Sequence, residues 1–297
     1  MNFRMKCLAQ TVFGLFPWGE EINYWAQRNL SGTLPPSRKR YEKKLAQALA
    51  HQEAFRKYGS REQGVVYEIG CGWHLAMALV FHSFGYPDIK ALDVNPHVRA
   101  ELVNSILGYM KEDHRIPKEA PLIGPDGDVQ KILRDAYGID LMVPGDSRST
   151  GMQTESIDYI YSQEVFEHIA PELIPDILAE CYHVLKRDGV ISLYICYSDH
   201  YYDVDKSITP YHFYRYTETA WRKYNSPLHY VNRLRHVDFL RFFRQAGFKV
   251  VEETVSRPVN WQEQLSRFPI CDDFASKYSM EELNITSARI VLKKCSR

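Results

Sequence analysis

From position 65 the sequence reads Val65-Val66-Tyr67-Glu68-Ile69-Gly70-Cys71-Gly72-Trp73. The apolar start of this stretch predicts a short buried strand, and residues 74–84 have the spacing of an amphipathic helix. Between them, two glycines one residue apart allow a tight turn and the close approach of a ligand to the backbone. Because the first turn of a helix has unpaired N–H groups, this combination is typical of a loop that binds a nucleotide-containing cofactor.

A second predicted strand supports this interpretation. Residues 89–94 read IKALDV, so that Asp93 ends an apolar run. It follows the glycines by roughly twenty residues, the separation at which a carboxylate accepts hydrogen bonds from ribose hydroxyls. A dinucleotide site would need a further glycine at position 75, which is Leu75. The pattern therefore favours a mononucleoside cofactor over NAD.

With these motifs in place, the sequence resembles the class I S-adenosylmethionine-dependent methyltransferases. VYEIGCG (66–72) looks like their first motif, ALDV (91–94) like the second, and GDS (145–147) like the turn that meets adenine. SIDYIYSQEVFEHI (156–169) resembles the fourth strand with its "EHI" tail, and residues 180–194 resemble the following helix, turn and fifth strand. The resemblance covers about residues 65–197 and resumes at 239–251. His74 stands where many members have a third glycine.

The resemblance implies an α/β fold. We expect a doubly wound, mostly parallel, Rossmann-like sheet of seven strands with helices on both faces and an antiparallel last strand. Short apolar strands alternating with helices agree with this arrangement. The expected organisation is an N-terminal helical extension (1–60) and a methyltransferase domain (61–297) with insertions near 114–138, 198–235 and 256–284. Residues 18–30 and 38–58 predict helices in the extension, and the basic side chains of the second are expected to be solvated.

The implied cofactor is S-adenosylmethionine. Gly70 and Gly72 would make room for it, and Glu68 would hold the loop or meet the methionine ammonium. Asp93 would bind the ribose, with Val94 against the adenine. The other expected cofactor residues are Asp146 and Ser147 at the adenine, and Gln163 and Glu164 beside the sulfonium. For Asp146, an ordinary turn-forming aspartate is the alternative.

The segment 198–235 follows the fifth predicted strand, at the edge where open α/β sheets bind ligands. It is rich in aromatic, Arg, Asp and His residues, which suit sugars and other polar acceptors. A small packed subdomain is the alternative. The predicted acceptor-binding residues are Tyr201, Tyr202, His212, Tyr214, Arg215 and Arg233.

A hydroxyl acceptor needs a base. His200 is the first candidate, with Asp199 to orient it, and His168 in the "EHI" tail is the second. A structural role is the alternative for each histidine. His200 and the acidic residues near it match no metal motif, so we expect no metal ion.

Composition restricts the acceptor. Basic and acidic residues number 37 each, which gives no electrostatic case for nucleic acid. The six cysteines show no metal or disulfide pattern, which predicts free thiols and a cytoplasmic protein.

The modestly apolar N-terminus is expected to pack on the body of the protein, and membrane contact is the less favoured alternative.

We therefore expect O-methylation of a small-molecule or glycan hydroxyl. The alternatives are N- or C-methylation of a small or lipid-linked acceptor, and a non-catalytic scaffold that retains the fold. The sequence does not predict the oligomeric state.

Overall fold

The computed structural model describes residues 2–14, 19–29, 32–117, 121–124, 128–266 and 268–295. Both ends of the helix predicted at 18–30, and parts of the insertion predicted at 114–138, lie outside the described residues. A seven-stranded sheet in the order β3-β2-β1-β4-β5-β7-β6 forms the centre of the molecule. Its strands are β1 Val65–Ile69, β2 Asp88–Leu92, β3 Ile139–Met142, β4 Ile157–Gln163, β5 Leu185–Cys196, β6 Phe248–Ser256 and β7 Ser287–Lys294. Strand β7 is antiparallel to both neighbours, and the other pairs are parallel, which confirms the predicted fold class.

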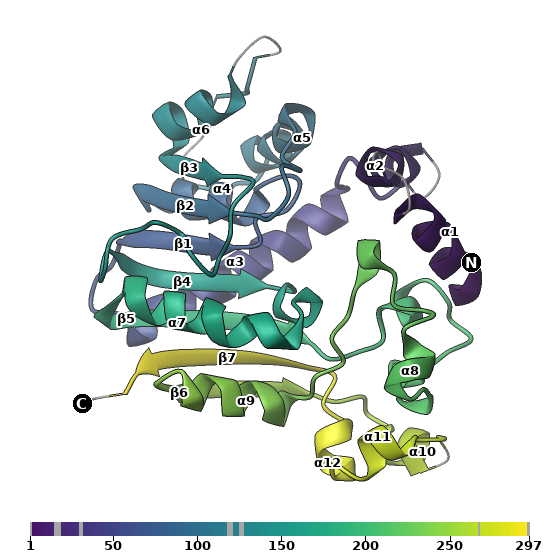
Figure 1. The fold of residues 1–297 in the computed structure, drawn as a ribbon. Coiled ribbons are helices and arrows are strands. Elements are labelled where there is room, and N and C mark those ends of the chain that lie inside the picture. The colour runs from purple at the N-terminus through teal and green to yellow at the C-terminus, as the bar shows by residue number, and fades with distance from the viewer. Residues whose placement is uncertain are drawn as a thin grey trace.

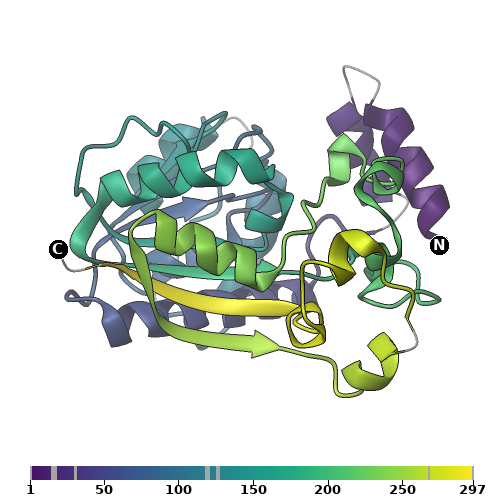
Figure 2. The same ribbon diagram turned by 60° about the horizontal axis from the view of Figure 1, so that its bottom comes forward.

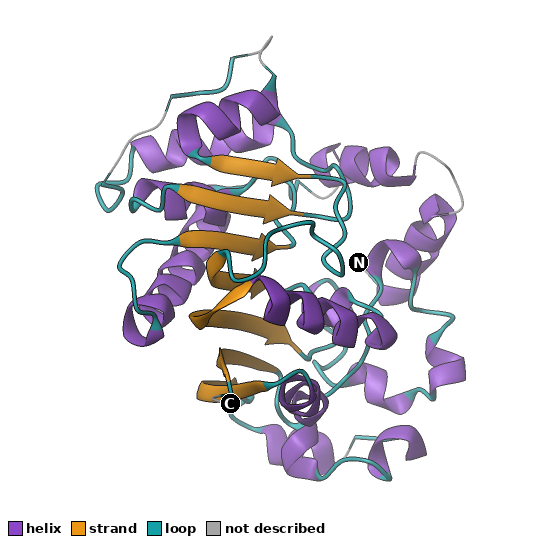
Figure 3. Ribbon diagram, turned by 60° about the vertical axis from the view of Figure 1, so that its left-hand side comes forward, coloured by secondary structure: helices purple, strands orange, loops and turns teal. Residues whose placement is uncertain are grey.

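Helices cover both faces of the sheet (Figures 1 and 3). On one face α3 (Arg38–Tyr58), α4 (Ala76–Ser83) and α5 (Ala100–Lys111) bury apolar side chains against the sheet. On the other face α7 (Ile174–Val184) and α9 (His236–Gln245) do the same. Because the parallel strands are buried on both sides, they need the nearly continuous apolar runs seen in the sequence.

Local sequence signals fix the helix ends. Helix α3 has the predicted bounds, and its N-cap Ser37 accepts a hydrogen bond from the Arg40 N–H. The predicted insertion at 114–138 contains α6 (Val129–Tyr137). Asp128 is its N-cap residue and Gly138 its C-cap residue. Gly138 has φ +62°, and a Cβ there would lie 2.2 Å from the Pro87 carbonyl oxygen. That position therefore needs glycine to lead the chain into β3.

A third hydrophobic cluster, the annex, lies beyond the carboxyl ends of the central strands (Figures 1 and 2). It joins α1 (Phe3–Gly14), much of the segment 198–235 and the segment 256–284, which the sequence analysis treated separately. Its helices and 3₁₀ turns are α8 (Glu218–Trp221), α10 (Trp261–Ser266), α11 (Asp272–Ala275), α12 (Met280–Leu283), 200–203, 212–215 and 227–229. The Phe3 ring lies 4.6 Å from that of His212, and the Phe3 N–H donates to Asp205. Residues 3–14 thus pack on the body of the protein, as expected, and residues 15–18 of the predicted segment lie outside the described residues.

Helix α2 (Gly19–Asn29) contacts the glycine loop and α5 through Tyr24. The Tyr24 ring stacks on the Trp73 ring at 5.4 Å, next to the glycine loop. Among the described helices, none has the length and apolar character needed to cross a bilayer.

Candidate functional site

A cavity of about 790 Å³ opens at the carboxyl ends of β1, β2 and β4. We call it the cleft. All nine residues predicted to bind the cofactor line it: Glu68, Gly70, Gly72, Asp93, Val94, Asp146, Ser147, Gln163 and Glu164. These residues come from four separate stretches of sequence, and parallel strand order brings them to one edge of the sheet.

The two glycines of the loop meet different requirements. Gly70 has φ +80°, and a Cβ there would lie 2.4 Å from Val165 Cγ2. Gly72 has φ +66°, and a Cβ there would meet no atom within 4 Å. The first glycine therefore allows the loop to pack on the chain that leaves β4. The second leaves space on the cleft side for a ligand.

Asp93 holds the loop from the end of β2. Its carboxylate accepts hydrogen bonds from the N–H of Gly72 at 2.9 Å and from the N–H of Asn95 at 3.1 Å. Lone pairs remain on both oxygens for ribose hydroxyls. Val94 beside it is 69% exposed and lines the cleft.

Asp146 stabilises a turn, which is the alternative role predicted for it from the sequence. Its carboxylate accepts from the Arg148 backbone N–H and pairs with the Arg148 guanidinium at 2.6 Å. It still lines the cleft and is half exposed, so a turn role and a ligand contact are compatible.

Opposite charges meet at the other end of the cleft. Burial raises the pKa of Glu68 to about 8, and Lys44 lies near enough to lower that pKa in part. The Lys44 amino group also lies 3.9 Å from Glu164, and burial lowers its pKa. The expectation that the basic side chains of this helix are solvated is wrong for Lys44, which lines the cleft because α3 packs beside β4 and β5.

His74 replaces the family's third glycine without closing the cavity. Its Nδ1 accepts a hydrogen bond from the Ala76 N–H at the start of α4, at 3.3 Å. Burial lowers the pKa of His74 to about 4, so the ring is neutral. Sequence reasoning missed other lining residues, notably Lys44, Trp73, His97 and Tyr230. The stacked rings of Trp73 and His97, 4.2 Å apart, join loops that are distant in sequence, which no spacing rule reveals.

The two candidate bases lie together. The His168 and His200 rings are 4.9 Å apart, and His168 lines the cleft. His168 Nδ1 lies 2.7 Å from the Tyr230 carbonyl oxygen. Since a carbonyl only accepts, Nδ1 carries the proton and Nε2 presents a lone pair. Burial lowers the pKa of His168, and it lowers that of His200 to about 3.

The predicted Asp199–His200 pair is wrong. Asp199 Oδ2 lies 2.9 Å from His212 Nδ1, and Asp199 Oδ1 accepts from the Tyr201 N–H. The 3₁₀ turn that starts at His200 directs the histidine toward His168, while Asp199 caps the turn from inside the annex.

The predicted acceptor-binding residues do not line the cleft. Four of them, Tyr201, His212, Tyr214 and Arg233, are buried in the annex. The Tyr214 hydroxyl donates to the Leu283 carbonyl, and Arg233 donates to the carbonyls of Phe213 and Tyr216. The other two, Tyr202 and Arg215, lie on the annex surface. These six residues are therefore not part of the proposed acceptor site.

The model of a family described as a methyltransferase domain matches residues 124–193. This match covers α6, β3, β4, α7 and part of β5, and the strand order adds the characteristic antiparallel β7. The match and the strand order support the class I S-adenosylmethionine-dependent methyltransferase superfamily. The predicted family is confirmed. Its cofactor, S-adenosylmethionine, fits the cleft, because Gly72 leaves space and Glu68 Oε2 is buried without a hydrogen-bond partner among the described residues.

Solved structures of similar fold include an S-adenosylmethionine-dependent methyltransferase from Methanosarcina mazei. It is 13% identical with a TM-score of 0.50, and the alignment covers 82% of this chain and 97% of that one. Geranyl diphosphate C-methyltransferase from Streptomyces coelicolor A3(2) is 12% identical with a TM-score of 0.48, covering 84% of this chain and 78% of that one. At these identities the likeness concerns the fold alone. No curated protein matches this chain.

Proposed function

We propose that this methyltransferase methylates a hydroxyl oxygen of a small molecule or glycan. The observation that carries the proposal is the imidazole of His168, which has an unprotonated Nε2 and lines a cleft together with all nine residues predicted to bind the cofactor. An alcohol must lose its proton as it is methylated, and such a lone pair can accept it. A neutral amine acceptor would not need this group.

Each part of the cleft has a distinct task. Asp93 accepts from the ribose hydroxyls, and Val94 and Asp146 meet the adenine. Glu68, which ionises as the ammonium binds, and Lys44 are suited to the ammonium and the carboxylate of the methionine moiety. The cofactor supplies a methyl group already activated on a sulfonium, so the protein has mainly to align the acceptor oxygen and exclude water.

The histidine tautomer explains the proton transfer. The Tyr230 carbonyl fixes the proton on His168 Nδ1, and burial keeps the ring neutral. The acceptor oxygen gives its proton to Nε2 while the new C–O bond forms and the S–CH₃ bond breaks. Because Asp199 is paired with His212, the geometry favours His168 over His200 as the base.

The first test is calorimetric titration with S-adenosylmethionine, S-adenosylhomocysteine and NADH. Micromolar binding of the two sulfur compounds and none of NADH is expected. Turnover is then screened against a panel of hydroxyl, amine and carbon acceptors by following S-adenosylhomocysteine release. His168→Gln should lower turnover of the hydroxyl acceptor at least tenfold and leave cofactor binding intact. His183→Gln, on the exposed side of α7, is the matched control.

Turnover of amines alone would overturn the hydroxyl proposal. Failure to bind either sulfur compound would favour the scaffold alternative.

A lipid-linked acceptor is the second candidate. Met5, Leu8 and Val12 lie on one side of α1 and are 66%, 66% and 41% exposed. Such an apolar stripe suits shallow contact with a membrane surface. Co-sedimentation with anionic vesicles tests it: binding that is lost in the Met5→Lys/Leu8→Lys double variant would favour a lipid-linked acceptor, and no sedimentation would exclude it.

A further inference from the structure

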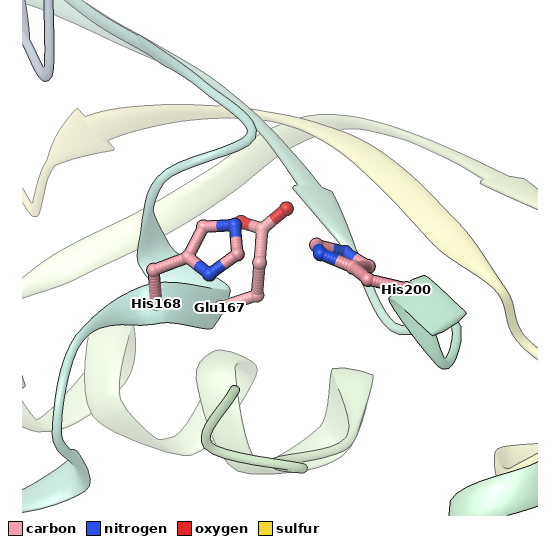
Figure 4. A group of neighbouring side chains, drawn as sticks. All are labelled: Glu167, His168 and His200. Atoms are coloured by element: carbon pink, nitrogen blue, oxygen red, sulfur yellow. The ribbon is translucent and has the colours of Figure 1, made fainter. Parts of the chain in front are cut away.

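Glu167, His168 and His200 bring three metal-binding atoms together beside the cleft. One carboxylate oxygen and one nitrogen of each ring all lie within 4.8 Å of one another. Figure 4 shows the carboxyl group and both rings pointing toward one another. Glu167 and His168 belong to the 3₁₀ turn after β4, and His200 begins the turn after β5. Two adjacent parallel strands thus place the group rigidly.

The donor atoms are left available by their surroundings. Glu167 is 2% exposed, and its Oε2 has no hydrogen-bond partner among the described residues. Its Oε1 accepts from the Cys196 N–H at 3.2 Å, which orients the carboxyl group. His168 is oriented by the Tyr230 carbonyl and has Nε2 available. A carbonyl oxygen that holds the other ring nitrogen of a histidine in this way is typical of metal-binding histidines.

A fourth group lies close by. The His229 ring is 5.7 Å from that of His200 and 6.1 Å from that of His168. Its buried Nε2 likewise has no hydrogen-bond partner among the described residues. Unpaired buried polar atoms are unfavourable, and two of them around one point indicate a missing ligand.

We propose that Glu167, His168 and His200 bind a divalent transition-metal ion, with His229 able to complete the coordination. Two imidazoles and one carboxylate suit zinc, iron(II), cobalt or manganese, whereas magnesium and calcium prefer oxygen ligands. At bond lengths of about 2.1 Å, donor atoms stand about 3–4 Å apart, so small side-chain rotations complete the site. The sequence predicted no metal because the candidate ligands there were His200 and the aspartates after β5, and of these only His200 belongs to the group.

The ion would face the acceptor, since His168 lines the cleft. This role rests on the proposed function. A hydroxyl oxygen bound to the ion loses its proton to solvent more readily, and the ion then replaces His168 Nε2 as the agent of activation. The C–O bond forms as the S–CH₃ bond breaks, with S-adenosylhomocysteine as the leaving product.

The test uses the full-length protein without a histidine tag, stripped with a chelator and titrated with Co²⁺. We expect one equivalent to bind with visible ligand-field absorption, and Zn²⁺ to displace it. Glu167→Gln and His200→Ala should each lower Co²⁺ affinity at least tenfold. His183→Ala, an exposed histidine on α7, should not change it. Thermal unfolding with and without Zn²⁺ gives a second readout, because a ligand of the native state raises Tm.

Absence of saturable binding, or affinity unchanged in both site variants, would overturn the proposal. S-adenosylmethionine is titrated into the same preparations, so that the two proposals fail separately. Loss of metal binding with intact cofactor binding rejects only the metal site. A bound metal without cofactor binding supports the metal site and rejects only the transferase function.

Discussion

The backbone N–H of Gly72 donates to Asp93 Oδ2 across 2.9 Å, joining the glycine loop to the end of the neighbouring strand. Asp93 therefore shapes the loop in addition to its proposed role at the ribose. The two motifs on which the family resemblance rests are one structural unit.

Asp93→Ala should lower S-adenosylmethionine affinity about tenfold or more, because two charge-assisted contacts and the loop tether are lost together. Asp93→Asn should lower the affinity for S-adenosylmethionine by a smaller factor, since the amide oxygen of asparagine still accepts a hydrogen bond from the Gly72 N–H. Calorimetric titration measures both. Asp88→Ala, at the far end of the same strand, is the control, and equal affinities in all these proteins would reject the ribose assignment.

The two loop glycines should respond differently to substitution by alanine. Gly70→Ala should destabilise the fold by at least about 2 kcal/mol, because Val165 must move and φ stays positive. Gly72→Ala should cost about 1 kcal/mol of backbone strain, yet weaken cofactor binding beyond that loss. Urea unfolding and cofactor titration are compared for each variant. Unchanged cofactor affinity in Gly72→Ala would mean that no ligand approaches this glycine.

Cofactor binding should release protons near pH 7. Burial raises the pKa of Glu68 to about 8, so the carboxyl group is largely protonated in the free protein. A methionine ammonium stabilises its ionised form and lowers that pKa. Calorimetry in buffers of different ionisation enthalpy measures the release. It should vanish in Glu68→Gln and with adenosine, which has no ammonium; persistent release in Glu68→Gln would exclude Glu68 as its source.

The same group makes stability depend on pH. Because the folded pKa is raised, the native state holds more protons between the unfolded value near 4.5 and about 8. The contribution is fully present below pH 4.5, falls through this window and is lost above pH 8. Urea unfolding at pH 5, 6.5 and 8 should show a steeper decline for the wild type than for Glu68→Gln. Parallel declines would contradict the assigned pKa.

Arg233 should matter for stability rather than for the acceptor. Arg233→Ala leaves the buried carbonyls of Phe213 and Tyr216 without their donor, and we expect a loss of about 2–3 kcal/mol in unfolding free energy. Arg215→Ala, on the exposed side of the same annex, should cost less than about 0.5 kcal/mol. A stable Arg233→Ala variant with a raised KM for the acceptor would restore the role predicted from the sequence.

The sequence predicted the sheet, and the nine residues expected to bind the cofactor line the cleft, because the signals for both are local. Apolar strands of five or so residues, the glycines after β1 and the acid after β2 are each readable within a short window. Those strands can pair in parallel in only a few ways. Their carboxyl ends therefore lie at one edge of the sheet, and the nine residues near those ends line one cleft.

Only the tertiary structure decided the rest. The annex joins α1 to segments about 200 and 270 residues later in the chain. The buried aromatic residues of these segments follow no regular spacing in the sequence, so the sequence does not show which of them face inward. Tyr214 and Arg233 became core, Asp199 paired with His212, and Lys44 turned into the cleft. His168 and His200 are individually ordinary in the sequence. Together with Glu167 they form the proposed metal-binding group, because β4 and β5 are neighbouring strands whose carboxyl ends bring the three side chains together.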